Sequence, residues 1–247
     1  MNTPGAPTAG RAHASARATP SSVAWVHSSV FALLLLSATS AAVATHAVGW
    51  WSPFTPLGDD ASSHITAIAR MATAMREGRG WWAPDYNIGF PMALYYQPLP
   101  HIVSGALCAL LGGAPAASVV YKLLAALMLV LQPWAVFLGM RRAGFDSGQA
   151  ACVGALSPLV LKGIEFGYNA HASLSIGLYT QAWGHVAFPL AVGELVALAR
   201  GRGSLLAAAV ASAFTASTHM FFAIALVPPL AITGLLLGSP MRGALRL

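Results

Sequence analysis

Two adjacent carboxylates, Asp59 and Asp60, are followed one helical turn later by His64 in the stretch GDDASSH. An aspartate can take a proton from an incoming hydroxyl as a general base, or help to hold a divalent cation. Aspartate is also a favoured N-cap, where the helix dipole stabilises its charge. Because one cap suffices for a helix start, two questions stay open: whether Asp60 or Asp59 is a base, and whether either is only a cap.

A loop rich in aromatic residues follows the acidic pair. The stretch WWAPDYNIGFPMALYYQPLP, residues 81–100, has neither a helical nor a strand period. Amphipathic rings suit a loop packed at the headgroup level of a bilayer, and rings also stack on sugars or lipid tails. We therefore consider Trp82, Asp85, Tyr95 and Tyr96 as ligand-binding candidates. An ordered interfacial plug that binds no ligand is the alternative.

An amphipathic helix is predicted between the acidic pair and this loop. Its apolar residues recur at helical spacing on one face, and they are Ile65, Ile68, Ala69, Ala72 and Met75. Gly78 and Gly80 end the pattern as C-terminal breakers. We expect a helix of about four turns that lies on the outer membrane surface.

The composition predicts an integral membrane protein. The chain is 57% hydrophobic and only 8% charged, whereas soluble domains carry about a quarter of charged residues. The formal charge of +6 comes from basic residues scattered at the ends of apolar runs, so we expect no nucleic-acid partner. Cys108 and Cys152 both lie in apolar runs, which favours packed thiols over a disulfide.

The apolar runs predict an all-α, polytopic transmembrane bundle of about seven spans. Residues 1–22 have the composition of a disordered cytoplasmic tail, and residues 23–247 form the transmembrane domain. A cleavable signal peptide is the alternative for the first run. The runs are 23–51, 99–113, 117–140, 150–161, 179–199 and 204–237. We expect His219 and the Pro228-Pro229 pair to divide the last run into a shorter and a longer helix.

The distribution of basic residues predicts the orientation, since loops rich in Lys and Arg face the cytoplasm. The cytoplasmic candidates are Arg11, Arg17, Arg200, Arg202, Arg242 and Arg246. Residues 52–98 then form the first extracytoplasmic loop. Glu194 is expected to reach toward Arg200, about one and a half turns away.

One conflict with this orientation concerns Arg141 and Arg142. If 99–113 and 117–140 both cross the membrane, these two arginines fall on the external side, against the rule. A re-entrant 99–113 removes the conflict. The sequence leaves both arrangements open.

The order of these features resembles the GT-C superfamily, polytopic glycosyltransferases that use lipid-phosphate-linked sugars. The resemblance rests on an early span, the external GDD…H, the stretch EG…W.PD…G.P…YY.PLP and a return helix. The nearest branch is the bacterial membrane proteins labelled 6-pyruvoyl-tetrahydropterin-synthase-related, although nothing in this sequence supports pterin chemistry. The likeness is specific over 58–100, and looser for YTQAWGHVAFPLAV (179–192) and STHMFF (217–222). It implies that the chain corresponds to the N-terminal part of a longer family member.

The resemblance implies roles for particular residues. Family members place an essential acidic residue in the first external loop, commonly in an acidic pair with an aromatic or His one turn later. Asp60, with His64 at that spacing, is the first choice for the base; Asp59 is the second, because Asp60 is followed by Ala61 rather than by an acidic residue. The donor implied is a polyprenyl-phosphate-linked sugar, used at the external face of the inner membrane with an unknown acceptor.

The leaving phosphate of such a donor needs a divalent cation or hydrogen-bond donors, because negative charge builds there as the bond breaks. The side chains considered around the substrate are His64, Arg70, Arg76, Arg79, His101 and His219. Ordinary roles compete with this one, since arginines contact lipid headgroups and imidazoles close helix ends.

A rival interpretation is a non-catalytic membrane scaffold, or a component of lipid or polysaccharide export, in which the aspartates are caps. The substitution Asp60→Ser separates the two, because serine also caps a helix but cannot act as a base. A secondary transporter is disfavoured, since the centres of 117–140 and 180–199 contain few glycines and prolines.

Overall fold

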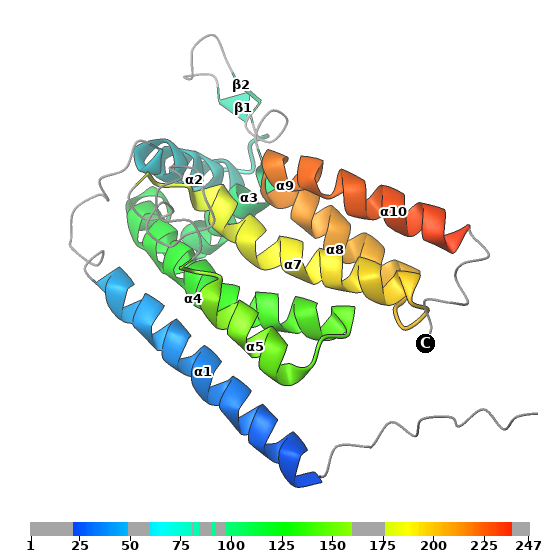
Figure 1. The fold of residues 1–247 in the computed structure, drawn as a ribbon. Coiled ribbons are helices and arrows are strands. Elements are labelled where there is room, and N and C mark those ends of the chain that lie inside the picture. Colours follow the sequence, from blue (N-terminus) through cyan, green and yellow to red (C-terminus); the bar gives the residue numbers. More distant parts are fainter. Residues whose placement is uncertain are drawn as a thin grey trace, which may run out of the picture.

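The computed structural model describes residues 22–48, 60–80, 82–83, 90–91, 97–159 and 176–238. These residues form a helical bundle with one short two-stranded antiparallel ladder at its edge (Figure 1). The helices are α1 (Ser22–Val48), α2 (Ala61–Arg76), α3 (Pro98–Leu110), η1 (Ala114–Ala116), α4 (Ala117–Ala143), α5 (Ser147–Leu156), α7 (Tyr179–Ala199), α8 (Leu205–Thr218), α9 (Met220–Ala225) and α10 (Val227–Leu237). The strands are β1 (Trp82–Ala83) and β2 (Phe90–Pro91).

Within the described residues, three helical segments are long and apolar enough to cross a membrane. They are Ala114–Ala143, Tyr179–Ala199 and Met220–Leu237. The apolar parts of α1, α3 and α8 are shorter, and the ten residues of α5 extend over only about 15 Å. The membrane character predicted from composition is therefore supported, while the described residues do not supply seven full-length spans.

The core of the bundle is the contact between α4 and α7, the most extensive helix pair. Gly139 and Gly193 allow this contact, because a Cβ at Gly139 would overlap the carbonyl of Pro189 and one at Gly193 would meet the backbone of Gly139. Small residues bring helix backbones together in this way in membrane proteins, where packing rather than water drives association. The two helices therefore form one rigid pair that reaches both ends of the bundle.

The predicted amphipathic helix is α2, but its buried face is wider than the predicted stripe. Ile68 and Ala72 are buried as expected, whereas Ile65 and Met75 are only half-buried. Met71 and His64 are fully on the buried side. The reason is that α2 packs along α3.

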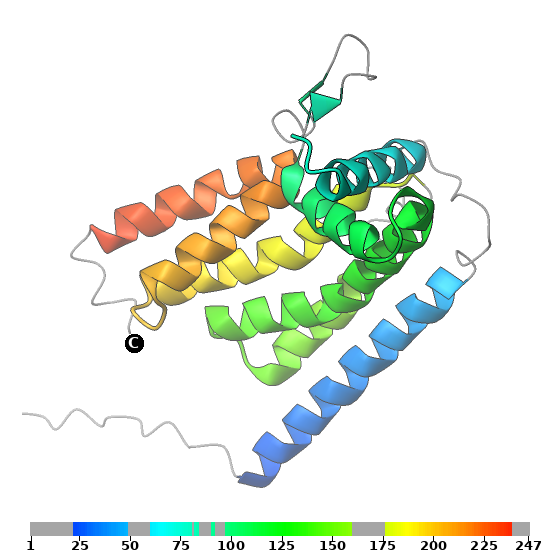
Figure 2. The ribbon, with the colours of Figure 1, turned by 180° about the vertical axis from the view of Figure 1, so that it is seen from behind.

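Helix α3 lies beside α2 along its whole length and stays at one end of the bundle (Figure 2). Met71 fits against Gly105, where a Cβ would have no room, and Arg76 lies against Gly113. At 13 residues, α3 is about 20 Å long. Helix α4 starts beside α3. Its last turn, which carries Arg142, therefore lies at the opposite end of the bundle. Helix α3 is not among the three described helical segments long enough to cross a membrane, and a re-entrant 99–113 stays a prediction.

The run 204–237 is divided as predicted. Helix α8 ends at Thr218, and His219 is extended, with φ −159° and ψ 136°. Its imidazole Nδ1 accepts a hydrogen bond from the backbone N–H of Phe221 at 3.2 Å and so caps α9. Pro228 lies in the first turn of α10, where a missing N–H leaves no bond unmade.

Candidate functional site

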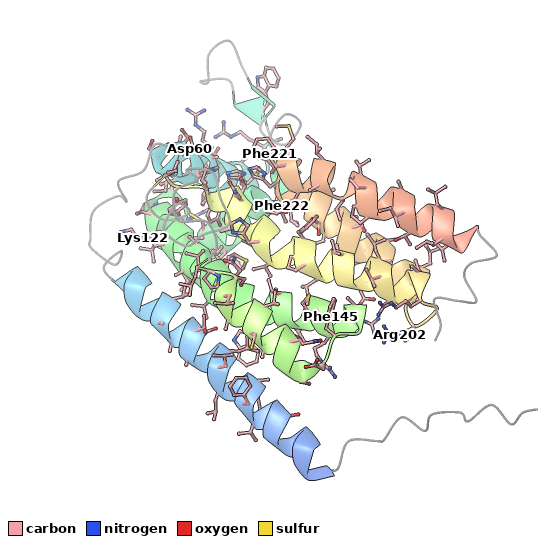
Figure 3. The ribbon with its side chains drawn as sticks, viewed as in Figure 1. Asp60, Lys122, Phe145, Arg202, Phe221 and Phe222 are labelled. Atoms are coloured by element: carbon pink, nitrogen blue, oxygen red, sulfur yellow. The ribbon has the colours of Figure 1, made fainter. Side chains whose placement is uncertain are left out.

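Asp60 stands at the start of α2, at the end of the bundle that also holds α3 (Figure 3). Its backbone N–H donates to the carbonyl of Ile176 at 3.0 Å, and its carbonyl accepts from the N–H of His64 at 3.1 Å. Its side chain is exposed. Within the part of the chain that the structure describes, the carboxylate makes no capping hydrogen bond, so the helix start is held by the backbone of Asp60 and not by its charge.

One helical turn after Asp60, His64 forms a buried imidazole pair with His101. His64 Nδ1 and His101 Nε2 lie 3.0 Å apart, with ring centroids at 5.2 Å and planes inclined by 25°. The exposed fractions of the two residues are 4% and 6%. His101 Nδ1 lies 3.1 Å from the carbonyl oxygen of Gln97. One histidine comes from α2 and the other from α3, so the pair forms only if these two helices pack side by side.

The partners of the pair assign its tautomers. A carbonyl oxygen only accepts, so His101 carries its proton on Nδ1 and donates it to Gln97. The Nε2 of a neutral His101 is then an acceptor, and His64 donates to it from Nδ1. In this chain of two bonds His64 Nε2 is the basic nitrogen of the pair.

Burial keeps both histidines neutral. Burial, together with smaller contributions from the nearby imidazoles of His101 and His219, lowers the pKa of His64 from 6.5 to about 3. Burial also lowers the pKa of His101, an effect that the bond to the Gln97 carbonyl partly opposes. A neutral His101 is what the tautomer assignment requires, since a doubly protonated ring has no acceptor nitrogen for the His64 N–H.

Tyr121 of α4 and Tyr179 of α7 pack against the imidazole of His64. Their ring centroids are 4.8 Å apart, and the Tyr179 ring lies 5.6 Å from His64. The Tyr179 hydroxyl is hydrogen-bonded to Ser104, whose own hydroxyl donates to the carbonyl of Pro100. We call His64, His101, Ser104, Tyr121 and Tyr179 the His–Tyr cluster.

A second group of rings lies next to the His–Tyr cluster, at the break between α8 and α9. Phe222 sits between two histidines, with ring centroids 5.5 Å from His185 and 5.9 Å from His219. Gly184 makes room for this phenyl ring, since a Cβ there would overlap it. The interruption of the helix at His219 therefore places the Phe222 ring against Gly184 of α7.

The site residues predicted from sequence fall into three groups. Asp60 and Trp82 are exposed, Trp82 by 55%, and Arg70 is half-buried. His64, His101 and His219 are buried, so they do not form part of the exposed surface. Four predicted residues lie outside the described part of the chain, and they are Asp59, Asp85, Tyr95 and Tyr96.

A divalent cation would need more ligands than the described residues offer. Among them, no group of three or more His, Cys, Asp or Glu side chains could hold a metal ion. Of the acidic pair only Asp60 is described, and Glu77 on the same helix is ion-paired with Arg79. We therefore derive no step through a metal ion.

Sequence reasoning missed Ser104, Tyr121 and Tyr179. The available signal is weak but physical: each is a hydroxyl within the first two turns of an apolar run, and all three runs start at the same end of the bundle. Comparison of the chain with protein-family models, with curated proteins and with solved structures finds no match. The function must therefore be argued from the geometry of this end of the bundle.

Proposed function

We propose that the chain is a GT-C-like membrane glycosyltransferase, or the N-terminal part of one, that transfers a sugar from a polyprenyl-phosphate donor to an acceptor. The observation that carries the proposal is the Asp60 carboxylate. It is exposed, it makes no capping bond among the described residues, and it lies one helical turn from the buried His64. An exposed carboxylate that caps no helix among these residues, at the end of an apolar bundle, can serve as a general base.

In the proposed reaction, Asp60 takes the proton of an acceptor hydroxyl while that oxygen attacks the anomeric carbon of the sugar. The bond between the anomeric carbon and the phosphate oxygen breaks, and polyprenyl phosphate leaves with the bonding electron pair. Arg70, a half-buried cation further along the same helix, is the residue that we assign to the charge on the leaving phosphate. The exposed indole of Trp82 offers a face for the sugar ring.

The role proposed for the His–Tyr cluster is to hold Asp60 in place. His64 lies one turn along α2 from Asp60, and its bond to His101 ties α2 to α3. Positioning of this kind matters because a misplacement of about 1 Å costs about 100-fold in rate. A multi-pass protein of about seven spans in the inner membrane, with this end on the external side, would let the lipid donor approach Asp60 from the bilayer.

The test is release of polyprenyl phosphate by the purified full chain in liposomes, supplied with a panel of polyprenyl-phosphate hexoses and pentoses and a panel of hydroxyl-bearing lipid and glycan acceptors. We expect release by the wild type, and a loss of about 100-fold or more in Asp60→Asn and in Asp60→Ser, since neither residue accepts the proton. Asp59→Asn measured beside them assigns the base within the pair.

Asp146→Asn is the matched control, because it removes a carboxylate from the start of another helix at the far end of the bundle. Its rate should stay within about twofold of the wild type. Full activity in Asp60→Asn and Asp59→Asn removes the catalytic role of the acidic pair. If no donor in the panel is turned over by the wild type, the non-catalytic scaffold is the better interpretation.

A further inference from the structure

A second charged site lies at the end of the bundle opposite Asp60, around the turn that joins α4 to α5 (Figure 3). Arg200 Nη1 donates to the carbonyl oxygen of Ala143 at 2.5 Å, and Arg202 Nη2 donates to the same oxygen at 3.4 Å. Arg141 Nη1 donates to the carbonyl of Phe145 at 2.7 Å. Three guanidinium groups from two separate segments thus converge on one turn, and we call them the arginine triad.

Gly144 makes this convergence possible. Its φ is +102°, a left-handed conformation that favours glycine at the end of a helix. A Cβ at this position would lie 2.5 Å from Arg200 Nη1 and 2.6 Å from Arg202 Nη2. The glycine therefore leaves the space in which the two guanidinium groups lie over the backbone.

Arg200 and Arg202 bring two positive charges to this turn, and each donates to a backbone carbonyl rather than to a carboxylate. Arg142 is excluded from the count, because Glu194 neutralises it through two bonds of 2.6 Å and 2.7 Å. The expectation that Glu194 reaches Arg200 was wrong, since the closer partner is on α4. Asp146 brings one negative charge to the turn, and one of its oxygens accepts from the N–H of Gln149 at 2.9 Å.

The position of the triad indicates which anion would meet these charges. Ala143 and Ala199 end two of the segments that are long enough to cross a membrane, so the triad lies at the depth of the lipid headgroups. Phe145, beside it, is 45% exposed, as expected for a ring at the interface. A guanidinium group binds a phosphate through two parallel N–H···O bonds, and the carbonyls at the end of α4 already hold these groups in place.

We propose that the arginine triad and Gly144 form a binding site for the phosphate ester of an anionic lipid headgroup. The site is independent of the function proposed for Asp60. Phosphatidylglycerol offers this phosphate without a compensating amine, whereas phosphatidylcholine offers it next to a positive charge. Free phosphate has the same oxygens and is the alternative source.

The test uses the purified full chain in nanodiscs of phosphatidylcholine with increasing phosphatidylglycerol, and measures bound lipid by native mass spectrometry after release. We expect selective retention of phosphatidylglycerol by the wild type. The double variant Arg200→Gln/Arg202→Gln should bind it about 30-fold more weakly, from the usual contribution of two arginines at an anionic surface. Arg242→Gln/Arg246→Gln, which removes the same charge outside the triad on the side predicted to be cytoplasmic, should stay within about threefold of the wild type.

Gly144→Asn separates geometry from charge, because asparagine tolerates positive φ but carries a Cβ. It keeps all three arginines, and it should still weaken binding by about tenfold, an effect a pure charge attraction does not predict. Wild-type retention in the double arginine variant would overturn the proposal, as would wild-type binding in Gly144→Asn. Binding of inorganic phosphate, in phosphatidylcholine nanodiscs, without any preference for phosphatidylglycerol would overturn the lipid as its source.

Discussion

Two helices of this bundle start at an aspartate, at opposite ends, and they use it differently. At α5, Asp146 Oδ1 accepts from the N–H of Gln149 at 2.9 Å, and Gln149 Oε1 accepts in return from the N–H of Asp146. At α2, the carboxylate of Asp60 makes no such bond among the described residues, and its backbone N–H goes to Ile176. The carboxylate of Asp146 stabilises a helix start, whereas that of Asp60 is exposed at the end of the bundle that holds the His–Tyr cluster.

The difference teaches that the type of residue at a helix start does not decide its use. Asp146 has extended backbone angles, φ −69° and ψ 165°, which point its side chain back at the first turn. Asp60 has helical angles, φ −98° and ψ −12°, and its side chain makes no capping bond among the described residues. A carboxylate that stabilises nothing locally is available for chemistry, and this contrast is the basis of the proposed function.

Among single substitutions, the largest expected effect comes from disrupting the contact between α4 and α7, the two helices that reach both ends of the bundle. Gly139→Ala places a Cβ against the carbonyl of Pro189, so α4 and α7 must separate and the protein should lose about 1–3 kcal/mol of stability. Gly234→Ala is the control, since no described atom lies within 4 Å of its Cβ position. Both variants are made in a Cys152→Ser background and heated in detergent. Unfolding is monitored by the reaction of a thiol-specific dye with the buried Cys108. Equal midpoints in the two variants would contradict this packing.

The next effect tests the buried imidazole pair. His101→Ala removes the acceptor of the His64 Nδ1–H, and an unpaired buried donor costs about 1–3 kcal/mol. His101→Gln should cost less, because its amide oxygen reaches the position of Nε2. The same thiol-labelling ramp compares them. An indistinguishable loss in the two variants would mean that the hydrogen bond itself contributes nothing.

The pair also predicts a pH dependence of stability. The pKa of His64 in the folded protein, about 3, is below its ordinary value of 6.5. Between these values the unfolded chain binds more protons, so stability falls as pH falls from 6.5 toward 3, by up to about 1.4 kcal/mol per pH unit. Melting midpoints measured across this range should decline less in His64→Gln than in the wild type. A parallel decline in both proteins would show that other groups govern the effect.

The smallest effect compares the two aspartates directly. Asp146→Ala should lose about 1 kcal/mol, the usual contribution of an N-cap. Asp60→Ala should change stability by less than about 0.5 kcal/mol, since its side chain makes no capping bond. Chemical denaturation in detergent resolves this difference. A loss in Asp60→Ala as large as that in Asp146→Ala would return Asp60 to a structural role.

Local patterns predicted much of the fold. The amphipathic period predicted α2, and the break at His219 divided the last run as expected, because both depend on residues close in sequence. The motif DSGQ would also have revealed the capping box of Asp146, since its spacing is itself the signal. These features need no knowledge of tertiary packing.

Contacts between distant residues were beyond the sequence. His64 meets His101 across 37 positions, and Arg142 meets Glu194 across 52. Glu194 was assigned to Arg200 because only the near neighbour is visible in a one-dimensional pattern. The His–Tyr cluster likewise depends on the packing of α3 beside α2. The pattern of basic residues did not decide how the segment 99–113 is arranged.

The central claim is that the Asp60 end faces outward while the arginine triad faces the cytoplasm. Cysteine labelling tests it most directly, with Asp60→Cys and Asp146→Cys made separately in a Cys152→Ser background, where the remaining Cys108 is buried. A membrane-impermeant maleimide added to spheroplasts should label Asp60→Cys at once, and Asp146→Cys only after the membrane is permeabilised. Protection of Asp60→Cys until permeabilisation, or labelling of both variants from the same side, would contradict the account.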